Sequence, residues 1–368
     1  MDGFDINQRV VLEGSQKGLK IPRMFTKEGV DVYTTVEWDK RTSMIKNPDG
    51  TVVFKMENVE VPKFWSQTAV DILAQKYFRK RGVPQFDWNG NPILDATGQQ
   101  MLGGETSLKQ VVHRLVGCWA WWGKKHGYFA SEEDLRAFYD ETAYMLLHQH
   151  VAPNSPQWFN VGLFYAYGIG GVAQGHCYVD PDTKELVRSK DAYSHPQCHA
   201  CFIQSITDTL VNEDGIMDLA LREARVFKHG SGTGSNFSNL RGKGEPLSGG
   251  GKSSGVMSFL KIFDVVAGAI KSGGTTRRAA KMDILNIDHP DIETFIKWKA
   301  EEEKKFAALV AAGLADGTNI EAAGEHVFGQ NSNNSVRITD EFMRSVLEDK
   351  DWSLIRRTDG KVSKTMKA

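Results

Sequence analysis

The chain has 368 residues, of which 25% are charged, and its formal net charge at pH 7 is −1. This length allows two domains or one large domain with a substantial core, and the balanced charge gives no bulk attraction to nucleic acid or to a membrane surface. No stretch approaches the ~18 apolar residues that cross a bilayer, and the first ten residues lack a signal peptide's apolar run, so neither is expected.

The first 160 residues change from mixed sequence to helical patterning. Residues 49–61, DGTVVFKMENVEV, predict short strands around an Asp-Gly turn. Apolar residues recur at intervals of three and four in three later stretches, which predict helices over residues 65–82, 107–127 and 131–150. The tryptophans of the second stretch, Trp119, Trp121 and Trp122, are expected in the core. We therefore expect an N-terminal extension over 1–60 and a helical domain over 61–160.

From residue 161 onward the pattern becomes short strands, glycine-rich turns and intervening helices, which is typical of an α/β fold. Helices are predicted over residues 214–230, 255–274 and 293–313, the second of them ended by its glycine pair. The third carries a run of charged residues that is expected to be a solvated face. Residues 161–368 are therefore expected to form one α/β domain.

The stretch HPQCHACF, residues 195–202, holds two of the four cysteines of the chain. Zinc would require four ligands within the seven residues 195–201, which strains a tetrahedral shell, and neither Cys118 nor Cys177 has a second cysteine nearby. A thioredoxin-like pair should open a helix, whereas Cys201 begins the β-branched run FIQSI, which predicts a strand. The sequence therefore favours one functional thiol, Cys201, and no metal site. Few cysteines without disulfide-like spacing also favour a reducing compartment, so the cytoplasm is the expected location.

Three glycine-rich stretches suggest contact with an anionic ligand. PLSGGGKSSG is not an ATPase P-loop, because Pro246 stands where the first glycine of that motif belongs. Glycines 249–251 are nevertheless expected to run directly into a helix N-terminus, which favours an anion, although they could equally serve a tight turn. HGSGTGSNF adds a second flexible turn. SGGTTRRAAK, residues 272–281, combines mobility with two arginines suited to phosphate.

Taken together, these motifs resemble those of ribonucleotide reductases. The motifs that match in the same order are NSPQWFN, QCHACF, SGTGSNFSNLR, GGGKSSGVMSFLKIFD, SGGTTRRAAK, DHPDIETFI and NNSVRITDEFM. The stretch EVPKFWSQTAVDILAQKYFRKRGVP, and the lack of an obvious ATP-binding cone before it, resemble the catalytic chain of the adenosylcobalamin-dependent class II enzymes. The resemblance implies a helical N-terminal domain followed by the first half of a ten-stranded α/β barrel.

The resemblance also implies a chemistry for individual residues. In this family a cobalamin-generated thiyl radical starts the reduction of a ribonucleotide, and two further cysteines reduce the ribose and become a disulfide. Cys201 matches the first of these reducing cysteines, while Cys198 has no assigned role. Ser155, Ala200 and Gly232 match positions that contact the substrate. A thioredoxin-like dithiol is the expected reductant, and ribonucleoside diphosphates are the expected substrates.

Other positions match the part of the family that controls substrate choice. Asp208, Thr209 and Leu210 match the segment that reads a deoxynucleoside triphosphate effector, and Arg241 matches a basic residue beside it. A second arginine of class I relatives is replaced here by Ser248, so that phosphate contact is not expected. The loop that relays effector identity to the substrate site corresponds to a stretch containing Gly273, Gly274, Arg277 and Arg278.

One element of the family's chemistry has no match in the sequence. None of the four cysteines is followed two residues later by glutamate, so the Asn-x-Cys-x-Glu motif of the radical cysteine is missing. We therefore expect this chain to correspond to the N-terminal third of a longer enzyme and to be inactive alone, with a homodimer as the expected assembly. The alternative is a nucleotide-binding regulatory module without catalysis.

Overall fold

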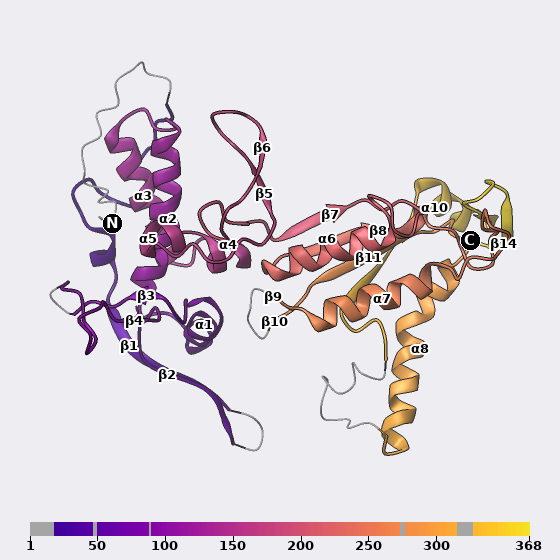
Figure 1. Ribbon diagram of the computed structural model, residues 1–368, viewed down its shortest axis with the longest axis horizontal. Coiled ribbons are helices and arrows are strands. Elements are labelled where there is room, and N and C mark those ends of the chain that lie inside the picture. The colour runs from indigo at the N-terminus through magenta and orange to yellow at the C-terminus, as the bar shows by residue number, and fades with distance from the viewer. Residues whose placement is uncertain (1–17, 47–49, 88–89, 273–276, 315–326) are drawn as a thin grey trace. The chain divides into compact units, whose positions relative to one another are not determined.

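The computed structural model describes residues 18–46, 50–87, 90–272, 277–314 and 327–368 (Figure 1). Contacts within the chain divide it into two compact units, Met1–His199 and Ala200–Ala368, which are described separately below. The domain limits expected at residues 60 and 160 stay predictions. Among the described residues, no helix combines the length and hydrophobicity needed to cross a bilayer.

The first unit is mainly helical, with small two-stranded sheets. Its elements in chain order are η1 (Val32–Thr35), β1 (Trp38–Lys46), β2 (Val52–Pro62), α1 (Gln67–Ile72), the π-helical turn η2 (Leu73–Tyr77), β3 (Val83–Pro84), β4 (Leu102–Gly103), α2 (Leu108–Lys125), α3 (Glu132–Leu147), α4 (Ser155–Asn160), α5 (Leu163–Tyr167), β5 (Cys177–Val179) and β6 (Leu186–Arg188). Strands β1 and β2 pair antiparallel, and Asp49 of the expected Asp-Gly turn lies outside the described residues. The prediction of strand in this stretch is confirmed, but the stretch holds one strand of 11 residues and not several short ones.

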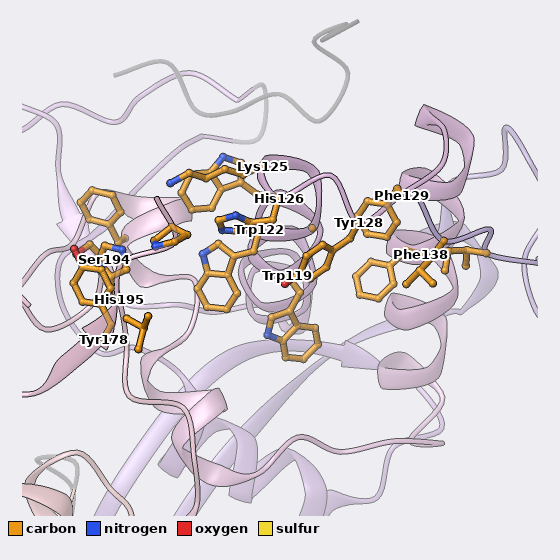
Figure 2. A pocket seen from close by; sticks show the side chains of 17 residues that line it. Trp119, Trp122, Lys125, His126, Tyr128, Phe129, Phe138, Tyr178, Ser194 and His195 are labelled. Carbon is orange, nitrogen blue, oxygen red and sulfur yellow. Dashed lines mark hydrogen bonds between the residues drawn. The ribbon is translucent and has the colours of Figure 1, made fainter. Parts of the chain in front are cut away.

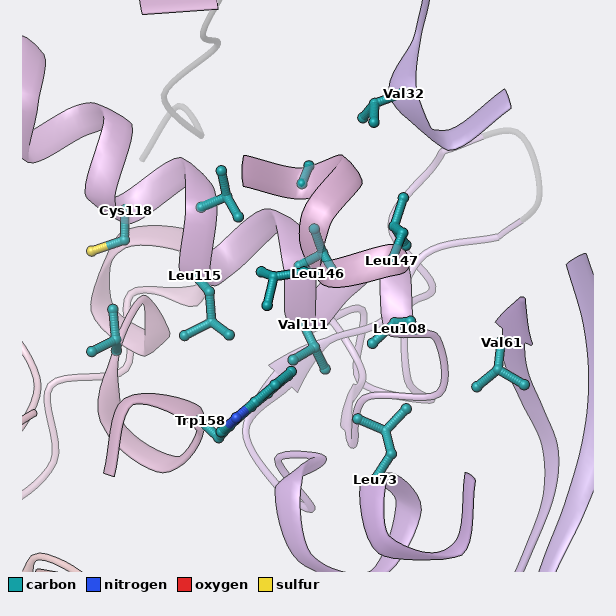
Figure 3. Close-up of a cluster of buried hydrophobic side chains, with 14 of the residues drawn as sticks. Val32, Val61, Leu73, Leu108, Val111, Leu115, Cys118, Leu146, Leu147 and Trp158 are labelled. Carbon is teal, nitrogen blue, oxygen red and sulfur yellow. The ribbon is translucent and has the colours of Figure 1, made fainter. Parts of the chain in front are cut away.

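Helices α2 and α3 form the centre of this unit. Helix α2 starts with a capping box in which the Ser107 and Gln110 side chains satisfy free backbone N–H groups. Its apolar face packs against α3, and Val111, Leu115 and Leu146 lie in the shared core (Figure 3). The helices predicted over 107–127 and 131–150 are confirmed.

The helix predicted over residues 65–82 is wrong in its second half. Regular helix ends at Ile72, continues as the π-helical turn to Tyr77, and gives way to extended backbone at Phe78. The cause is tertiary, because the N–H of Arg79 donates to Glu105 Oε2 at 2.7 Å and its carbonyl accepts from the Glu105 N–H at 2.8 Å. These bonds hold Arg79 in an extended pairing that a helix would forbid.

A buried ion pair anchors the C-terminal part of the first unit. Arg114 Nε lies 2.6 Å from Glu105 Oε1, and both side chains are almost fully buried. The Arg114 guanidinium also donates to the carbonyl oxygens of Trp158 at 2.8 Å and Val161 at 2.9 Å. Gly162 follows with φ 79°, and a Cβ there would lie 1.9 Å from the Arg114 carbonyl oxygen. The ion pair and this close approach fix the path of the chain through α4.

The second unit is an α/β structure. Its elements in chain order are β7 (Cys201–Gln204), α6 (Ile216–Lys228), β8 (Gly232–Asn236), η3 (Phe237–Asn239), α7 (Val256–Ala269), β9 (Lys271–Ser272), β10 (Arg277–Arg278), β11 (Lys281–Asn286), α8 (Ile292–Ala311), β12 (Ser332–Arg337), α10 (Asp340–Leu347), β13 (Asp351–Ile355) and β14 (Val362–Lys367). Strands β12, β11, β8 and β7 form a parallel sheet in that order, with α6 and α7 alongside it in Figure 1. The α/β class is confirmed.

The two faces of this parallel sheet differ. On one face, buried residues of β11 such as Lys281 and Leu285 point toward the helices, because alternate residues of a strand face opposite sides. On the other face, Ile203 of β7 is 97% exposed and Met282 of β11 is 41% exposed. The second face is thus open within this unit.

The three helices predicted in this unit are present, with one difference. Helix α7 ends at Ala269, where Ile270 turns to extended backbone at φ −96° and ψ 117°, and the chain continues into β9. The glycine pair expected to end this helix lies outside the described residues. Strand formation, and not a glycine cap, therefore ends α7.

Candidate functional site

Cys201 is the first residue of the edge strand β7, as the sequence predicts. Its side chain is exposed, and it shares the open face of the sheet with Ile203, two residues further along the strand. A thiol in this position is accessible to a ligand that lies against the sheet. Its location therefore suits a redox thiol.

Gly232 and Ala200 lie directly beside this thiol. Gly232 is opposite Cys201 in the parallel register, and its N–H donates to the Ala200 carbonyl oxygen at 2.6 Å. A Cβ on Gly232 would lie 2.8 Å from the Ala280 carbonyl oxygen. The close approach of Ala280, the residue just before β11, therefore requires a glycine here. The structure brings together three of the four predicted substrate-contact residues.

Cys198 has different surroundings. It is half-buried and packs against the hydrophobic core of the first unit, and burial raises the pKa of its thiol. The nearby His195 ring stacks on Tyr178 with centroids 3.6 Å apart. Within the described ranges, no group of three or more His, Cys, Asp or Glu side chains is arranged to hold a metal ion. Cys198 and Cys201 thus lie in unlike environments.

Ser155, the fourth predicted substrate contact, belongs to the first unit. It begins α4, where Asn154 caps the helix by accepting from the Gln157 N–H at 3.3 Å. The Ser155 hydroxyl lies 3.2 Å from the Tyr77 hydroxyl, and Tyr77 stacks on Trp158. Sequence reasoning missed Tyr77, because a contact across 78 residues leaves no local signal.

The predicted effector residues lie together in the second unit. Arg241 forms an ion pair with Asp208. The carbonyl oxygens of Thr209 and Leu210 accept from the N–H groups of Ile216 and Met217 at 2.8 and 2.9 Å, so this segment caps the start of α6. The Leu210 side chain is 54% exposed. The segment is held by its backbone and leaves this side chain open to solvent.

The anion site considered at glycines 249–251 is not formed in the expected way. These glycines lie in a turn in which the Leu247 N–H donates to the Gly251 carbonyl oxygen and the Gly250 N–H donates to the Leu247 carbonyl oxygen, and the turn ends five residues before α7 begins. The buried Asp291 carboxylate accepts from the Val256 N–H at 2.9 Å and from the Lys243 N–H at 2.9 Å. A carboxylate of the chain itself therefore occupies the helix N-terminus.

The predicted specificity loop is only partly described. Gly273 and Gly274 lie outside the described residues. The backbones of Arg277 and Arg278 pair antiparallel with those of Ser272 and Lys271, as strands β10 and β9. The loop is therefore bounded by a short hairpin.

A buried charge cluster lies on the opposite face of the sheet from Cys201, beneath β8 and β11, and sequence reasoning missed it. Lys281 Nζ is 2.5 Å from Glu223 Oε1 and 3.0 Å from Asp283 Oδ1, and all three side chains are fully buried. Burial raises the pKa of both carboxyl groups, and the Lys281 ammonium only partly offsets this effect. The alternation KMDILN gives a weak signal, since its two charged residues fall on the face that an amphipathic strand buries.

These features define an α/β protein with an accessible cysteine on the edge of a parallel sheet, close to backbone that only glycine permits. Residues 39–149 match the family model described as class II vitamin B12-dependent ribonucleotide reductase, and residues 199–367 match the ribonucleotide reductase barrel domain. The chain belongs to the class II vitamin B12-dependent ribonucleotide reductase family.

Similar proteins carry the same description. The vitamin B12-dependent ribonucleotide reductases of Bradyrhizobium diazoefficiens and Agrobacterium fabrum are 50% and 49% identical over 95% of this chain. A vitamin B12-dependent ribonucleoside-diphosphate reductase of Thermoplasma acidophilum is 35% identical over 47% of the chain and 19% of its own length. The chain spans about a third, 34%, of the length of the first two relatives.

Proposed function

We propose that this chain supplies part of the substrate site of an enzyme that reduces ribonucleotides to 2′-deoxyribonucleotides, the precursors of DNA. The observation that carries the proposal is the exposed Cys201 thiol beside Gly232 on the open face of a parallel sheet. The family membership of the chain supports it. Ribonucleoside diphosphates are the proposed substrates, in line with the description of the Thermoplasma relative.

The proposed role of Cys201 is that of a reductant. Replacement of the ribose 2′-hydroxyl by hydrogen consumes two electrons and two protons and releases water. Two thiols that become one disulfide supply both electrons and both protons. Cys201 is one of these thiols, its partner is a cysteine outside this chain, and a thioredoxin-type dithiol restores the pair. Ser155, Ala200 and Gly232 are proposed to contact the substrate.

Adenosylcobalamin is the proposed cofactor, and in this family it supplies the radical that oxidises a cysteine. A corrin requires a broad enclosing surface, whereas the face beside Cys201 is open, with Ile203 97% exposed. The described residues therefore do not form a corrin site by themselves.

We also propose that the four-stranded sheet is the first part of a ten-stranded α/β barrel and that the chain acts in the cytoplasm as a homodimer. Asp208, Thr209, Leu210 and Arg241 are proposed to bind a deoxynucleoside triphosphate effector. The loop containing Gly273, Gly274, Arg277 and Arg278 is proposed to relay the identity of the effector to the substrate site.

Replacing both Arg277 and Arg278 by alanine should reduce the effector's influence on which base is reduced. Equal loss of activity for all four substrates, with the effector response intact, would contradict this role.

The test uses a chimera in which this chain replaces the matching third of the Bradyrhizobium relative. With adenosylcobalamin, a ribonucleoside diphosphate, an effector and thioredoxin, the chimera should form deoxyribonucleotide. Cys201→Ser should abolish this turnover, and Cys198→Ser should leave it intact. The chain alone should be inactive, because none of its cysteines lies in an Asn-x-Cys-x-Glu motif. A chimera that binds nucleotide but never turns over would instead favour a regulatory module.

A further inference from the structure

The first unit contains a pocket of about 780 Å³ (Figure 2). None of the proposed substrate-contact or effector residues lines it. It lies between the C-terminal half of α2, the start of α3 and the segment around β5. Aromatic rings form most of its wall, among them those of Trp119, Trp121, Trp122, Phe129, Phe138 and Tyr178. The three tryptophans expected in the core are only half-buried, because one side of each faces this pocket. The volume lies within the range of small-molecule sites.

Hydrogen bonds and stacking hold the walls of the pocket in place. Trp119 Nε1 donates to Gln157 Oε1 at 3.2 Å, which fixes the indole from outside the pocket. On the other side, the Tyr178 and His195 rings stack with an interplanar angle of 3°. The His195 carbonyl oxygen lies 2.7 Å from His176 Nε2. The pocket therefore offers flat, preformed surfaces to a planar ring.

The polar groups at this pocket favour a negatively charged ligand. Its lining includes the side chains of Lys125, His126, Ser194 and His195, and no carboxylate among the described residues. Lys125 is exposed, and its Nζ lies 5.9 Å from the centre of the Trp121 ring. An ammonium group at the rim of an aromatic pocket can pair with an anionic substituent while the rings take the planar part.

We propose that this pocket is a separate binding site for a nucleoside phosphate, with the base against the aromatic wall and the phosphates beside Lys125. Neither the aromatic rings nor the Lys125 ammonium alone favours a nucleoside phosphate over other ligands. An apolar ligand would leave the cation unused, and a simple anion would leave the aromatic surface uncovered. The site lies in the first unit, whereas the proposed effector residues lie in the second.

The test measures binding of ATP to the full chain by equilibrium dialysis and maps the site with 8-azidoadenosine triphosphate and mass spectrometry. Cross-links are expected on peptides that contain Trp122, Tyr128 or Tyr178. Trp122→Ala should weaken ATP binding at this site roughly 5- to 100-fold, the range for one stacked base. Lys125→Glu, a change of an exposed side chain, should weaken binding of ATP but not of adenosine. Trp352→Ala in the second unit is the matched control and should change neither.

Three outcomes would overturn the proposal. Cross-links confined to residues 200–368 would leave only the effector and substrate sites. Equal effects of Lys125→Glu on ATP and adenosine would make the pocket merely apolar. ATP binding that appears only after removal of residues 1–17 would make that segment of the chain the occupant. Circular dichroism of each variant separates loss of the site from loss of the fold.

Discussion

The two units bury charge in opposite ways. In the first, the Arg114 guanidinium pairs with one carboxylate, Glu105, and its remaining donors reach backbone carbonyl oxygens. In the second, the Lys281 ammonium lies between two carboxyl groups, those of Glu223 and Asp283, and contacts both. Glu223 Oε2 accepts no hydrogen bond from the described residues. One cluster pairs one cation with one carboxylate and is well bonded, whereas the other sets two carboxyl groups against one ammonium.

The two charge clusters also support different parts of the candidate site. The balanced pair fixes the chain through α4, where Ser155 lies. The unbalanced cluster lies beneath β8 and β11, on the opposite face of the sheet from Cys201, and Lys281 also contacts the aromatic rings of Phe237 and Phe263. We infer that the first cluster is a rigid support, while the second responds to pH because its carboxyl groups titrate above their ordinary values.

The largest expected effect is at the balanced pair. Arg114→Met should lower the free energy of unfolding by about 3–5 kcal/mol, because it leaves the Glu105 carboxylate buried without its cation. Urea unfolding measures the loss, and hydrogen exchange should show the least protection in α2 and α4. Lys63→Ala breaks the exposed ion pair with Glu37 and is the control, with no measurable change expected. A small effect of Arg114→Met would mean that the pair is dispensable.

A smaller effect is expected beside Cys201, where β8 approaches β11. Gly232→Ala should cost about 1–3 kcal/mol, because the new Cβ meets the Ala280 carbonyl oxygen at 2.8 Å. Gly234→Ala in the same strand is the matched control, since the new Cβ would lie 3.9 Å from the Met282 Cβ, an ordinary van der Waals distance. Thermal unfolding of both variants decides the matter. Equal stability would remove the steric reason for glycine at residue 232.

The smallest expected effect is on the pH dependence of stability, which should have opposite signs for two buried glutamates, Glu141 and Glu223. Burial opposes ionisation of Glu141, but hydrogen bonds from the Thr26 side chain and from the Thr26 and Phe25 N–H groups outweigh it and lower its pKa. Its stabilisation is therefore present at neutral pH and lost as the pH falls through the folded-state pKa. Burial raises the pKa of Glu223 above its ordinary value of 4.5. Its stabilisation is therefore present below pH 4.5 and lost as the pH rises through the folded-state pKa.

Glutamine at each position tests this difference. Glu141→Gln should destabilise the chain more at pH 7 than at pH 4, and Glu223→Gln should destabilise it more at pH 4 than at pH 7. Urea unfolding at the two pH values measures both. The same sign for both variants would contradict the contrast between the two units.

Local patterns predicted much of the fold, while long-range contacts explain what they missed. The periodicity of residues 107–127 and the capping residue Ser107 define α2 within one stretch of chain. The helix predicted over 65–82 fails because its end depends on Glu105, which lies beyond it in sequence. Asp291 likewise caps α7 from 35 residues away.

In the candidate site, too, features with a local sequence signal were predicted and features made by long-range contacts were missed. Cys201 was recognisable, because a β-branched run after the cysteine predicts a strand and the neighbouring motifs resemble a known family. The core expectation for the tryptophans is confirmed only in part: Trp119 and Trp122 pack against the core, but composition alone does not show that one side of each ring faces a pocket. The cluster around Lys281 was missed for a related reason, because its partners meet only when β11 and α6 pack together.

The central claim is that Cys201, and not Cys198, is the working thiol of this chain. The most direct measurement is a single turnover of the chimera without external reductant, followed by mass-spectrometric mapping of its disulfides. The account predicts that Cys201 is oxidised in proportion to the deoxyribonucleotide formed, in a disulfide with a cysteine from outside this chain, while Cys198 stays reduced. A disulfide at Cys198, including one between Cys198 and Cys201, would contradict it.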